Sequence, residues 1–356
     1  MGPYTIRGFL TLSVSHPLLT KTALLILVSL IVSPTTSSSS SSNDSSPDDN
    51  SSYSKRGLIY ISPDSSDYDV LTDPASPLTW YYNYSPWPSS NLTSWTTNFA
   101  PMVHGTTSAA TDVDTIKAVL NGSAGVPLSN SPDQPGNSIT HVLSFNEPDG
   151  DEDSGGSDSS PQHAAQVYID TLLPLRSEPW NLKLSLPATT GSPRGLEWLR
   201  DFNESCHDIQ DSGCEFDFVA THWYGDFAGM ASWLGQIHEL YPQKDVWVTE
   251  FAIAGLDAYE TEAFMNQSLP YLDGLDYVSR YAWFGTFRSD DANEWTGDGV
   301  SMLDDDGALT ALGAEYLGGK ADGFEEGMGG GAAGVRHSFG LLVVSLMTAL
   351  MTAFAS

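Results

Sequence analysis

The stretch HVLSFNEPD at residues 141–149 and the stretch VWVTEF at residues 246–251 decide the fold prediction. Each is a run of mostly apolar residues that leads into a glutamate, Glu147 in the first and Glu250 in the second. Runs that are apolar on both faces are typical of parallel strands covered by helices. In an α/β barrel, side chains at the carboxyl ends of the parallel strands carry the chemistry. We therefore expect both glutamates at the mouth of one barrel.

Strand-like runs of the same kind recur through residues 57–317, a stretch that has the length of a typical TIM barrel, about 250 residues. Helix-length segments separate most of these runs. This alternation predicts an α/β fold with a single (β/α)8 TIM barrel and disordered tails on both sides. The eight predicted strands are 57–61, 78–82, 98–103, 141–145, 182–186, 216–223, 246–251 and 277–284, and the predicted helices are 111–120, 161–173, 193–202, 228–241 and 258–269.

Glu147 and Glu250 end the fourth and the seventh predicted strands, which lie on opposite sides of a barrel mouth. Two carboxyl groups about 5–5.5 Å apart can cleave a glycosidic bond with retention, one as nucleophile and the other as acid and then base. Taken singly, Glu147 could equally be a solvated turn residue before Pro148, and Glu250 a salt-bridged strand end. As a pair in these positions they indicate a glycosidase active site.

Six motifs, in chain order, resemble glycoside hydrolase family 128, the glycosyl hydrolase catalytic core or alkali-sensitive-linkage-like group of fungal cell-wall proteins. The resemblance spans nearly all of residues 57–317 and includes LDDDG and LTALG near the end of that range. The motifs are KRGL at 55–58, FNEPD at 145–149, PATT at 187–190, DFVATHWYG at 217–225, WVTEFA at 247–252 and RYAWFG at 280–285.

The resemblance implies endo-type hydrolysis of β-1,3-glucan, with Glu147 as acid/base and Glu250 as nucleophile. It also implies that Asn146 binds the 2-hydroxyl of the sugar, a contact that strengthens in the transition state. Transglycosylation is open as well, because a sugar can replace water in the second step. Two further functions are compatible with the sequence: a glucan-binding wall protein with little turnover, and a structural surface coat.

An uncharged glucan with apolar ring faces is bound by aromatic side chains and hydrogen bonds more than by counter-charges. Aromatic residues at or near predicted strand ends are candidates, and each could instead pack beneath a helix. His222 and Tyr224 could orient Glu250. Trp295 is a weaker candidate in a loop. The predicted substrate-binding residues are Asn146, Trp80, Tyr82, His222, Trp223, Tyr224 and Trp283.

Two segments depart from the family pattern. Residues 150–160 form an acidic, Gly/Ser-rich stretch directly after the FNEPD motif, where the resemblance implies a shorter connection. This stretch could narrow the cleft or act on Glu147 through like charge, and we expect it to hang in solvent. The third predicted strand ends in PMVHG at 101–105, where the family often has an aromatic platform, so one sugar subsite is expected to differ.

The N-terminal residues 1–33 have the order of a secretory signal, with an apolar stretch at 18–32. An uncleaved signal anchor is the alternative. Residues 34–56 contain too little apolar content to fold and are expected to be a linker or propeptide. Lys55 and Arg56 suggest a dibasic processing site, although they could be two ordinary surface charges.

The C-terminal residues have the pattern of a second targeting signal. A Gly-rich tether is expected at 318–338, with small residues at 329–331, and an apolar tail follows at 339–356. Small residues, a polar spacer and a terminal apolar tail are typical of a GPI-attachment signal. A membrane span is the alternative, but the tail is short for one. We expect a secreted protein that is attached to the cell surface or cell wall through a GPI anchor.

The chain has 45 acidic and 14 basic residues, a net charge of −31, which argues against nucleic acid and anionic lipid as partners. Cys206 and Cys214 are predicted to form one small-loop disulfide in an oxidising compartment, a free buried pair being the alternative. No His or Cys stands at ligand spacing for zinc, and we expect no metal, no cofactor and a monomer. Sequons at Asn43 and Asn50 precede the domain, and the glycosylation candidates within it are Asn83, Asn91, Asn121, Asn203 and Asn266.

Overall fold

The computed structural model describes residues 54–61, 65–92, 98–125 and 139–330. The chain divides into two units, Met1–Ser51 and Ser52–Ser356, and all described residues belong to the second. The predicted signal segment, most of the predicted linker, the two N-terminal sequons and the predicted apolar tail lie outside the described residues. None of the described helices is long and apolar enough to cross a membrane.

The strands form a curled parallel sheet in the order β3-β2-β1-β8-β7-β6-β5-β4. This order leaves β3 and β4 at the two edges, and one parallel bridge between Met102 and Leu143 joins the segments that follow them. The predicted parallel α/β fold is therefore confirmed. The strands are β1 (Arg56–Ile59), β2 (Trp80–Tyr82), β3 (Asn98–Phe99), β4 (His141–Val142), β5 (Lys183–Leu186), β6 (Phe218–Tyr224), β7 (Asp245–Ala252) and β8 (Val278–Trp283).

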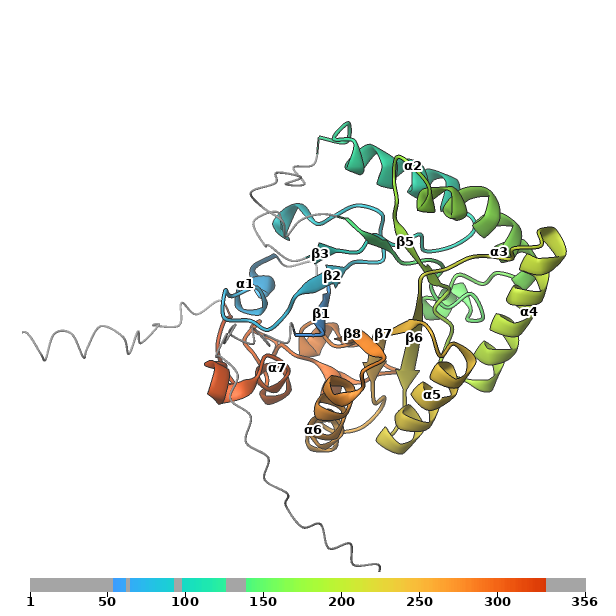
Figure 1. Cartoon of the computed structure of the whole chain (residues 1–356). Coiled ribbons are helices and arrows are strands. Elements are labelled where there is room, and N and C mark those ends of the chain that lie inside the picture. Colours follow the sequence, from blue (N-terminus) through green and yellow to red (C-terminus); the bar gives the residue numbers. More distant parts are fainter. Residues whose placement is uncertain (1–53, 62–64, 93–97, 126–138, 331–356) are drawn as a thin grey trace, which may run out of the picture. The chain divides into compact units, whose positions relative to one another are not determined.

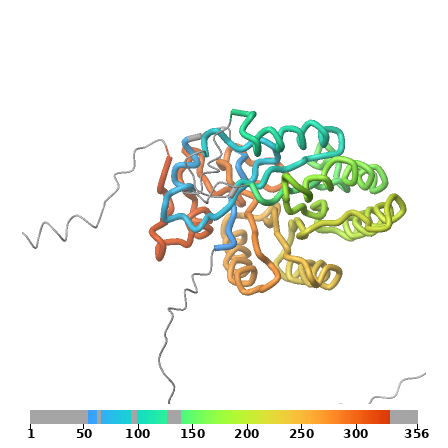
Figure 2. Tube along the Cα trace, turned by 45° about the horizontal axis from the view of Figure 1, so that its top comes forward, coloured from blue at the N-terminus to red at the C-terminus, as the bar shows by residue number. Residues whose placement is uncertain are grey.

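Helices follow most of the strands and lie around the outside of the sheet (Figures 1 and 2). Between β2 and β3 the described residues contain only a short 3-10 turn, Ser90–Leu92. Five helices begin after a Ser, Asp or Thr whose side chain accepts a backbone N–H of the first turn, which explains where they start. The helices are α1 (Tyr68–Leu71), α2 (Ala109–Leu120), α3 (Pro161–Val167), α4 (Pro193–Ile209), α5 (Phe227–Leu240), α6 (Ala258–Gly274) and α7 (Ala311–Tyr316).

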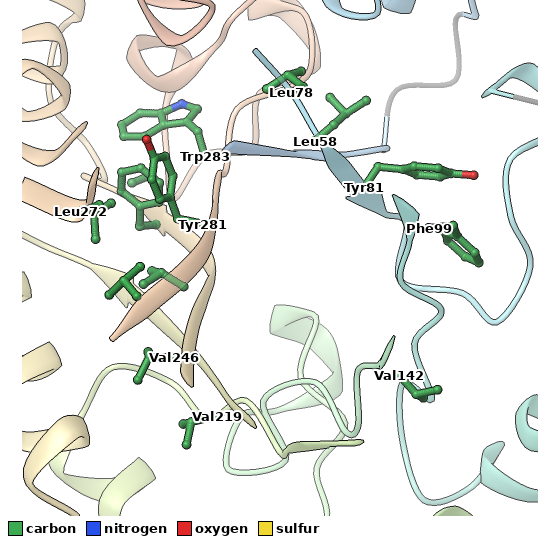
Figure 3. Packing of buried hydrophobic residues seen from close by; sticks show 14 of the residues in the cluster. Leu58, Leu78, Tyr81, Phe99, Val142, Val219, Val246, Leu272, Tyr281 and Trp283 are labelled. Atoms are coloured by element: carbon green, nitrogen blue, oxygen red, sulfur yellow. The ribbon is translucent and has the colours of Figure 1, made fainter. Parts of the chain in front are cut away.

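Alternation along the strands divides the core into two layers. Leu58, Tyr81, Val219 and Trp283 point outward from the sheet and pack with the helices (Figure 3). The residues between them point inward and form a second cluster inside the curl of the sheet. Side chains from every strand or from the residues just after it meet in that inner cluster: Ile59, Trp80, Tyr82, Ala100, Met102, Leu143, Ala188, Phe218, Ala220, Trp247 and Ala282.

The N-terminal boundary differs from the prediction because the dibasic pair belongs to the fold. Arg56 is the first residue of β1 and pairs with Tyr281 of β8. The ammonium of Lys55 donates to the backbone carbonyls of Leu272, Asp273 and Leu275 at the end of α6, at 2.9–3.1 Å. Cleavage after Arg56 would remove residues that hold β1 in place, so the assignment of Lys55 and Arg56 to a processed linker is corrected.

The C-terminal boundary also moves, since folded structure continues beyond Leu317 to Gly330. Phe324 is buried at 2% exposure. The backbone N–H of Leu309 donates to the carbonyl of Met328 at 2.7 Å, and Gly329 forms a bridge with Ala308. The first part of the predicted tether is therefore a packed edge of the domain.

The predicted disulfide between Cys206 and Cys214 is confirmed. It joins the end of α4 to the loop before β6, and both residues are buried. Among the sequon asparagines in the described residues, Asn83 is half-buried and its amide donates to the carbonyl of Trp87 at 2.8 Å. The others are exposed: Asn91, Asn121, Asn203 and Asn266.

Candidate active site

Glu250 reaches the inside of the sheet because β7 carries an irregularity in its pairing with β6. Thr221 pairs with Val248, whereas the next residue, His222, pairs with Glu250, so Thr249 is an extra residue on β7. Val248 lies in the outer core, and an uninterrupted alternation would place Glu250 on that same outer face. The bulge reverses the alternation and turns Glu250 inward, a use of bulges that recurs beside active sites.

Glu147 reaches the same place through an unusual backbone conformation. Its φ is +38°, in the left-handed region that a residue with a side chain rarely occupies. The backbone N–H of Glu147 donates to the carbonyl of Ala188 at 2.7 Å, and its carbonyl accepts from Gly150 at 2.8 Å and from Ser157 at 3.2 Å. These bonds hold the strained turn, and as a result Asn146 and Glu147, although consecutive, both line one cleft.

The buried imidazole of His222 connects the two glutamates. Its Nδ1 lies 2.8 Å from Oε1 of Glu147 and 3.4 Å from Oε2 of Glu250. One carboxylate oxygen of each glutamate and a nitrogen of His222 all lie within 4.8 Å of one another. The geometry is that of a proton-sharing group, because the imidazole faces both carboxylates and each carboxylate can accept its N–H.

Phenol groups surround the carboxylate of Glu250. Tyr84 donates to Oε1 at 2.7 Å and Tyr224 donates to Oε2 at 2.6 Å. Tyr82 donates to the carbonyl of Thr249 at 3.0 Å and lies 3.5 Å from Oε1 of Glu250. Burial and the adjacent charge of Glu250 hold the pKa of all three tyrosines well above the ordinary value, so they stay protonated and act as donors.

The pKa values of Glu250 and His222 are both raised. Burial raises the pKa of Glu250, and the charge of Glu147 adds to this, while His222 and the phenols of Tyr224 and Tyr84 act in the opposite direction. Burial lowers the pKa of His222, but the carboxylates of Glu250 and Glu147 outweigh burial and leave it above its ordinary value. Glu250 therefore keeps its proton over a range of pH in which a lone glutamate would have lost it.

A cleft of about 880 Å³ opens over the two carboxylates. On one side it is lined by the acidic loop, defined here as residues 150–160, through Gly150, Asp151, Asp153 and Gly155. Residues 151–155 are exposed, as expected for a solvated loop, but the loop is bonded to the domain through its backbone. It contains a 3-10 turn, Glu152–Ser154, and folds back over the turn of Glu147.

Asp149 ties the turn of Glu147 to the neighbouring loop after β5. Its carboxylate accepts a hydrogen bond from the backbone N–H of Thr190 at 3.0 Å and another from the Thr190 hydroxyl. Arg194, which lines the cleft, lies 3.7 Å from the same carboxylate. The side chain of Asp149 is almost fully buried, so these bonds compensate the charge that burial leaves without water.

The structure brings together four of the predicted residues besides the glutamates. Asn146 and Tyr224 line the cleft, and His222 and Tyr82 lie beneath it against the carboxylates.

Three predicted tryptophans do not line the cleft, and their assignment as sugar platforms is corrected. Trp283 is fully buried in the outer core, and its indole N–H donates to the carbonyl of Val300 at 2.8 Å. Trp80 is fully buried at the base of the inner cluster, where it lies over Gly57, which has no room for a Cβ. Trp223 is half-buried and packs on Trp233 of α5. Trp223 on β6 and Trp283 on β8 occupy positions whose side chains point outward from the sheet.

Sequence reasoning missed several residues that line the cleft. Tyr84 lies two residues after β2 with φ +56°, a conformation that neither strand nor turn periodicity signals. Phe284 is the inward neighbour of Trp283 on the strand continuing from β8. His104 of the PMVHG motif also lines the cleft, and so does Trp295, the weaker candidate from the sequence, which is 59% exposed with its ring 4.7 Å from that of Tyr224.

Comparison with known proteins identifies the family. Residues 57–316 match the family model described as glycosyl hydrolase catalytic core. Alkali-sensitive linkage protein 1 of Schizosaccharomyces pombe is 29% identical over 271 residues, which cover 74% of this chain and 44% of that protein, so the chain spans less than half of this relative's length.

Two solved structures are similar in fold and sequence. One is a family 128 (subgroup II) endo-β-1,3-glucanase from Pseudomonas viridiflava, with a TM-score of 0.58 and 26% identity, covering 74% of this chain and 97% of that one. The other is a family 128 (subgroup III) curdlan-specific exo-β-1,3-glucanase from Blastomyces gilchristii in complex with glucose, with a TM-score of 0.54, 26% identity and the same coverage. With its two strand-end glutamates in a cleft and a family match over most of its length, the chain belongs to glycoside hydrolase family 128.

Proposed function

We propose that this protein is a retaining β-1,3-glucanase that acts on cell-wall glucan. The observation that carries the proposal is the pair of carboxylates, Glu147 and Glu250, within 4.8 Å at the floor of one cleft. Retaining glycosidases have carboxyl groups about 5–5.5 Å apart, whereas inverting enzymes need about 6.5–9.5 Å to admit a water molecule. The separation therefore favours retention. The β-1,3-glucanase structures described above supply the substrate class.

In the first step, the carboxylate of Glu250 attacks the anomeric carbon as the glycosidic C–O bond breaks, and Glu147 gives its proton to the leaving oxygen. In the second step, Glu147 takes a proton from water, whose oxygen replaces Glu250 at the anomeric carbon. The phenols of Tyr84 and Tyr224 donate to Glu250 and so stabilise its ionised form, which is the nucleophile. His222 keeps both carboxylates in position.

The complete fold in this proposal is a (β/α)8 barrel. The inner cluster, to which every strand or its following segment contributes, and the bridge between Met102 and Leu143 support a barrel that closes between β3 and β4. Closure places the ends of β4 and β7 across one mouth, as the two-carboxylate mechanism requires.

The cleft suits a neutral polysaccharide. Phe284 and Trp295 offer ring faces for stacking on sugars, and Asn146 and His104 offer hydrogen-bonding groups. The similar structures include an endo-acting and an exo-acting enzyme. We assign endo action on the motif resemblance, with a glucan-binding protein of low turnover as the second candidate.

For its location, we propose a secreted glycoprotein monomer that is retained at the cell surface or in the wall by a GPI anchor. The segments at 1–33 and 339–356 carry this part of the proposal, together with exposed sequon asparagines in the folded domain.

The function is tested with the full-length secreted protein and linear β-1,3-glucan. The unmodified protein is expected to release oligosaccharides, and Glu250→Gln, which keeps the size of the side chain, is expected to bind glucan without cleaving it. Binding without turnover by the unmodified protein would establish the second candidate. Neither binding nor turnover would reject both.

A further inference from the structure

The acidic loop is attached to the active site by its backbone and not by its charges. Gly150 and Ser157 both donate to the carbonyl of Glu147, and Gly156 donates to the carbonyl of Asp151 at 3.0 Å. There is no room for a side chain at Gly156, because a Cβ there would lie 2.4 Å from the carbonyl oxygen of Gly150 and 2.8 Å from that of Glu147. The loop can pack this closely only because residue 156 is glycine.

The carbonyl of Gly155 accepts a hydrogen bond from the side-chain amide of Asn146, with Nδ2 to O at 3.1 Å. A carbonyl can only accept, so the NH2 group of Asn146 must face the loop and the amide oxygen must face away from it. Gly155 holds this position with a φ of +88°, which other residues rarely adopt.

The oxygen of the Asn146 amide has no hydrogen-bond partner among the described residues. Asn146 is 96% buried, as its 4% exposure shows, and lines the cleft beside Glu147. A buried acceptor without a partner costs about 1–3 kcal/mol, which a ligand that donates a hydrogen bond would recover. The amide oxygen of Asn146 is therefore an acceptor whose orientation is set by the acidic loop, which lies outside the FNEPD motif.

We propose that the acidic loop is a specificity device: its Gly155 carbonyl fixes the Asn146 amide so that only its oxygen faces the sugar held against Glu250. Asn146 then selects a sugar that donates a hydroxyl to this oxygen, which the family resemblance names as the 2-hydroxyl, and Gly155 is a positioning residue that acts through Asn146. Without the loop, the amide can turn and present either N–H or oxygen. This inference rests on the proposed function.

The test uses two substrates, nitrophenyl β-laminaribioside and the analogue without the 2-hydroxyl on the sugar that carries the nitrophenol. The ratio of their kcat/KM values measures discrimination, and dividing the ratio of a variant by that of the unmodified protein cancels the difference in intrinsic reactivity. Gly156→Ala, which displaces the loop, is expected to lower the ratio roughly threefold to tenfold, the worth of one hydrogen bond. Gly235→Ala, at a helical glycine with open space around it, is the control and is expected to leave the ratio unchanged.

Asn146→Ala identifies the route of the effect. It is expected to lower the same ratio, and adding Gly156→Ala to it should change the ratio no further. If Gly156→Ala does not fold, Gly155→Ala replaces it with Gly122→Ala as its control, since both glycines have positive φ and open space for a Cβ. A folded loop variant with an unchanged ratio overturns the inference.

The same ratio is measured as binding affinity for the two compounds in a Glu250→Gln background, which removes the chemical step. Absence of turnover in the unmodified protein contradicts the proposed function, whereas the binding ratio still decides the role of the loop. A binding ratio that Gly156→Ala leaves unchanged overturns the inference.

Discussion

Replacing Tyr84 by phenylalanine removes one hydroxyl from the surroundings of Glu250. That hydroxyl donates to Oε1 of Glu250 at 2.7 Å, and no other side chain in the described part of the chain bonds this oxygen at a comparable distance, since Tyr82 lies 3.5 Å away. A hydrogen bond to a charged group is worth about 1.5–3 kcal/mol, and 1.36 kcal/mol corresponds to one pKa unit. The bond stabilises the ionised carboxylate more than the protonated acid, so its loss raises the pKa of Glu250 further.

The Tyr84→Phe variant is therefore expected to move the acid limb of the kcat/KM profile to higher pH by about one to two units, and to lower kcat/KM on the acid side by about 10- to 100-fold. The assay is the pH dependence of kcat/KM on nitrophenyl β-laminaribioside. Tyr168→Phe is the matched control, because its buried hydroxyl donates to the carbonyl of Ser185 at 3.1 Å, away from the cleft. It should lower stability and leave the profile in place. An acid limb that stays fixed in Tyr84→Phe, or moves to lower pH, would refute the reasoning.

Three further predictions follow from the same structure. Glu147→Ala should slow hydrolysis of β-1,3-glucan by roughly 10²–10⁴-fold but spare the first step on a dinitrophenyl glycoside, because that leaving group needs no acid. Azide should restore product release in this variant, and equal losses on both substrates would argue against the acid role. The pKa of His222 in the folded protein exceeds its ordinary 6.5, so the stability it contributes is full below that pH and is lost as pH rises through the folded pKa, and the raised pKa of Glu250 acts in the same direction above 4.5. Tm should therefore fall more steeply between about pH 5 and 8 in the unmodified protein than in Glu250→Gln. Parallel Tm curves would contradict this. Phe324→Ala should cost roughly 3–5 kcal/mol of unfolding free energy in denaturant titrations, against little for the more exposed Met328→Ala, and equal small effects would mean that this segment is not packed on the domain.

The parts of the fold that depend on composition and periodicity were predictable from the sequence. Apolar runs separated by amphipathic segments predicted a parallel α/β fold, and the positions of Glu147 and Glu250 at strand ends predicted a shared site. The five predicted helices begin within two residues of α2, α3, α4, α5 and α6, whereas the short helices α1 and α7 were not predicted. Capping side chains such as Ser192 and Asp257 mark some of these starts locally.

The direction of individual side chains was not predictable, because it depends on the phase of each strand. Trp283 and Phe284 are adjacent aromatics, and the sequence alone does not say which of them faces the cleft. The bulge at Thr249 could not be predicted from the sequence either. A strand that alternates without interruption would have put Glu250 in the outer core. Tyr84 was missed because its left-handed backbone lies outside any regular pattern.

Composition misled the prediction where the backbone makes the contacts. The acidic loop has the residues of a solvated segment, yet its backbone N–H groups bond to the carbonyl of Glu147. The Gly-rich residues up to Gly330 have the composition of a tether, yet they pair with Ala308 and bury Phe324. Backbone hydrogen bonds between distant residues leave no mark in composition.

Identification of the nucleophile decides whether Glu250 forms a covalent glycosyl-enzyme. The protein is treated with dinitrophenyl 2-deoxy-2-fluoro-β-laminaribioside, whose fluorine slows the second step so that the glycosyl-enzyme accumulates, and the labelled peptide is sequenced by mass spectrometry. One equivalent of label is expected, carried by Glu250 in the WVTEFA segment and absent from Glu250→Gln. Label on Glu147, or steady turnover of this substrate without any labelled protein, would contradict it.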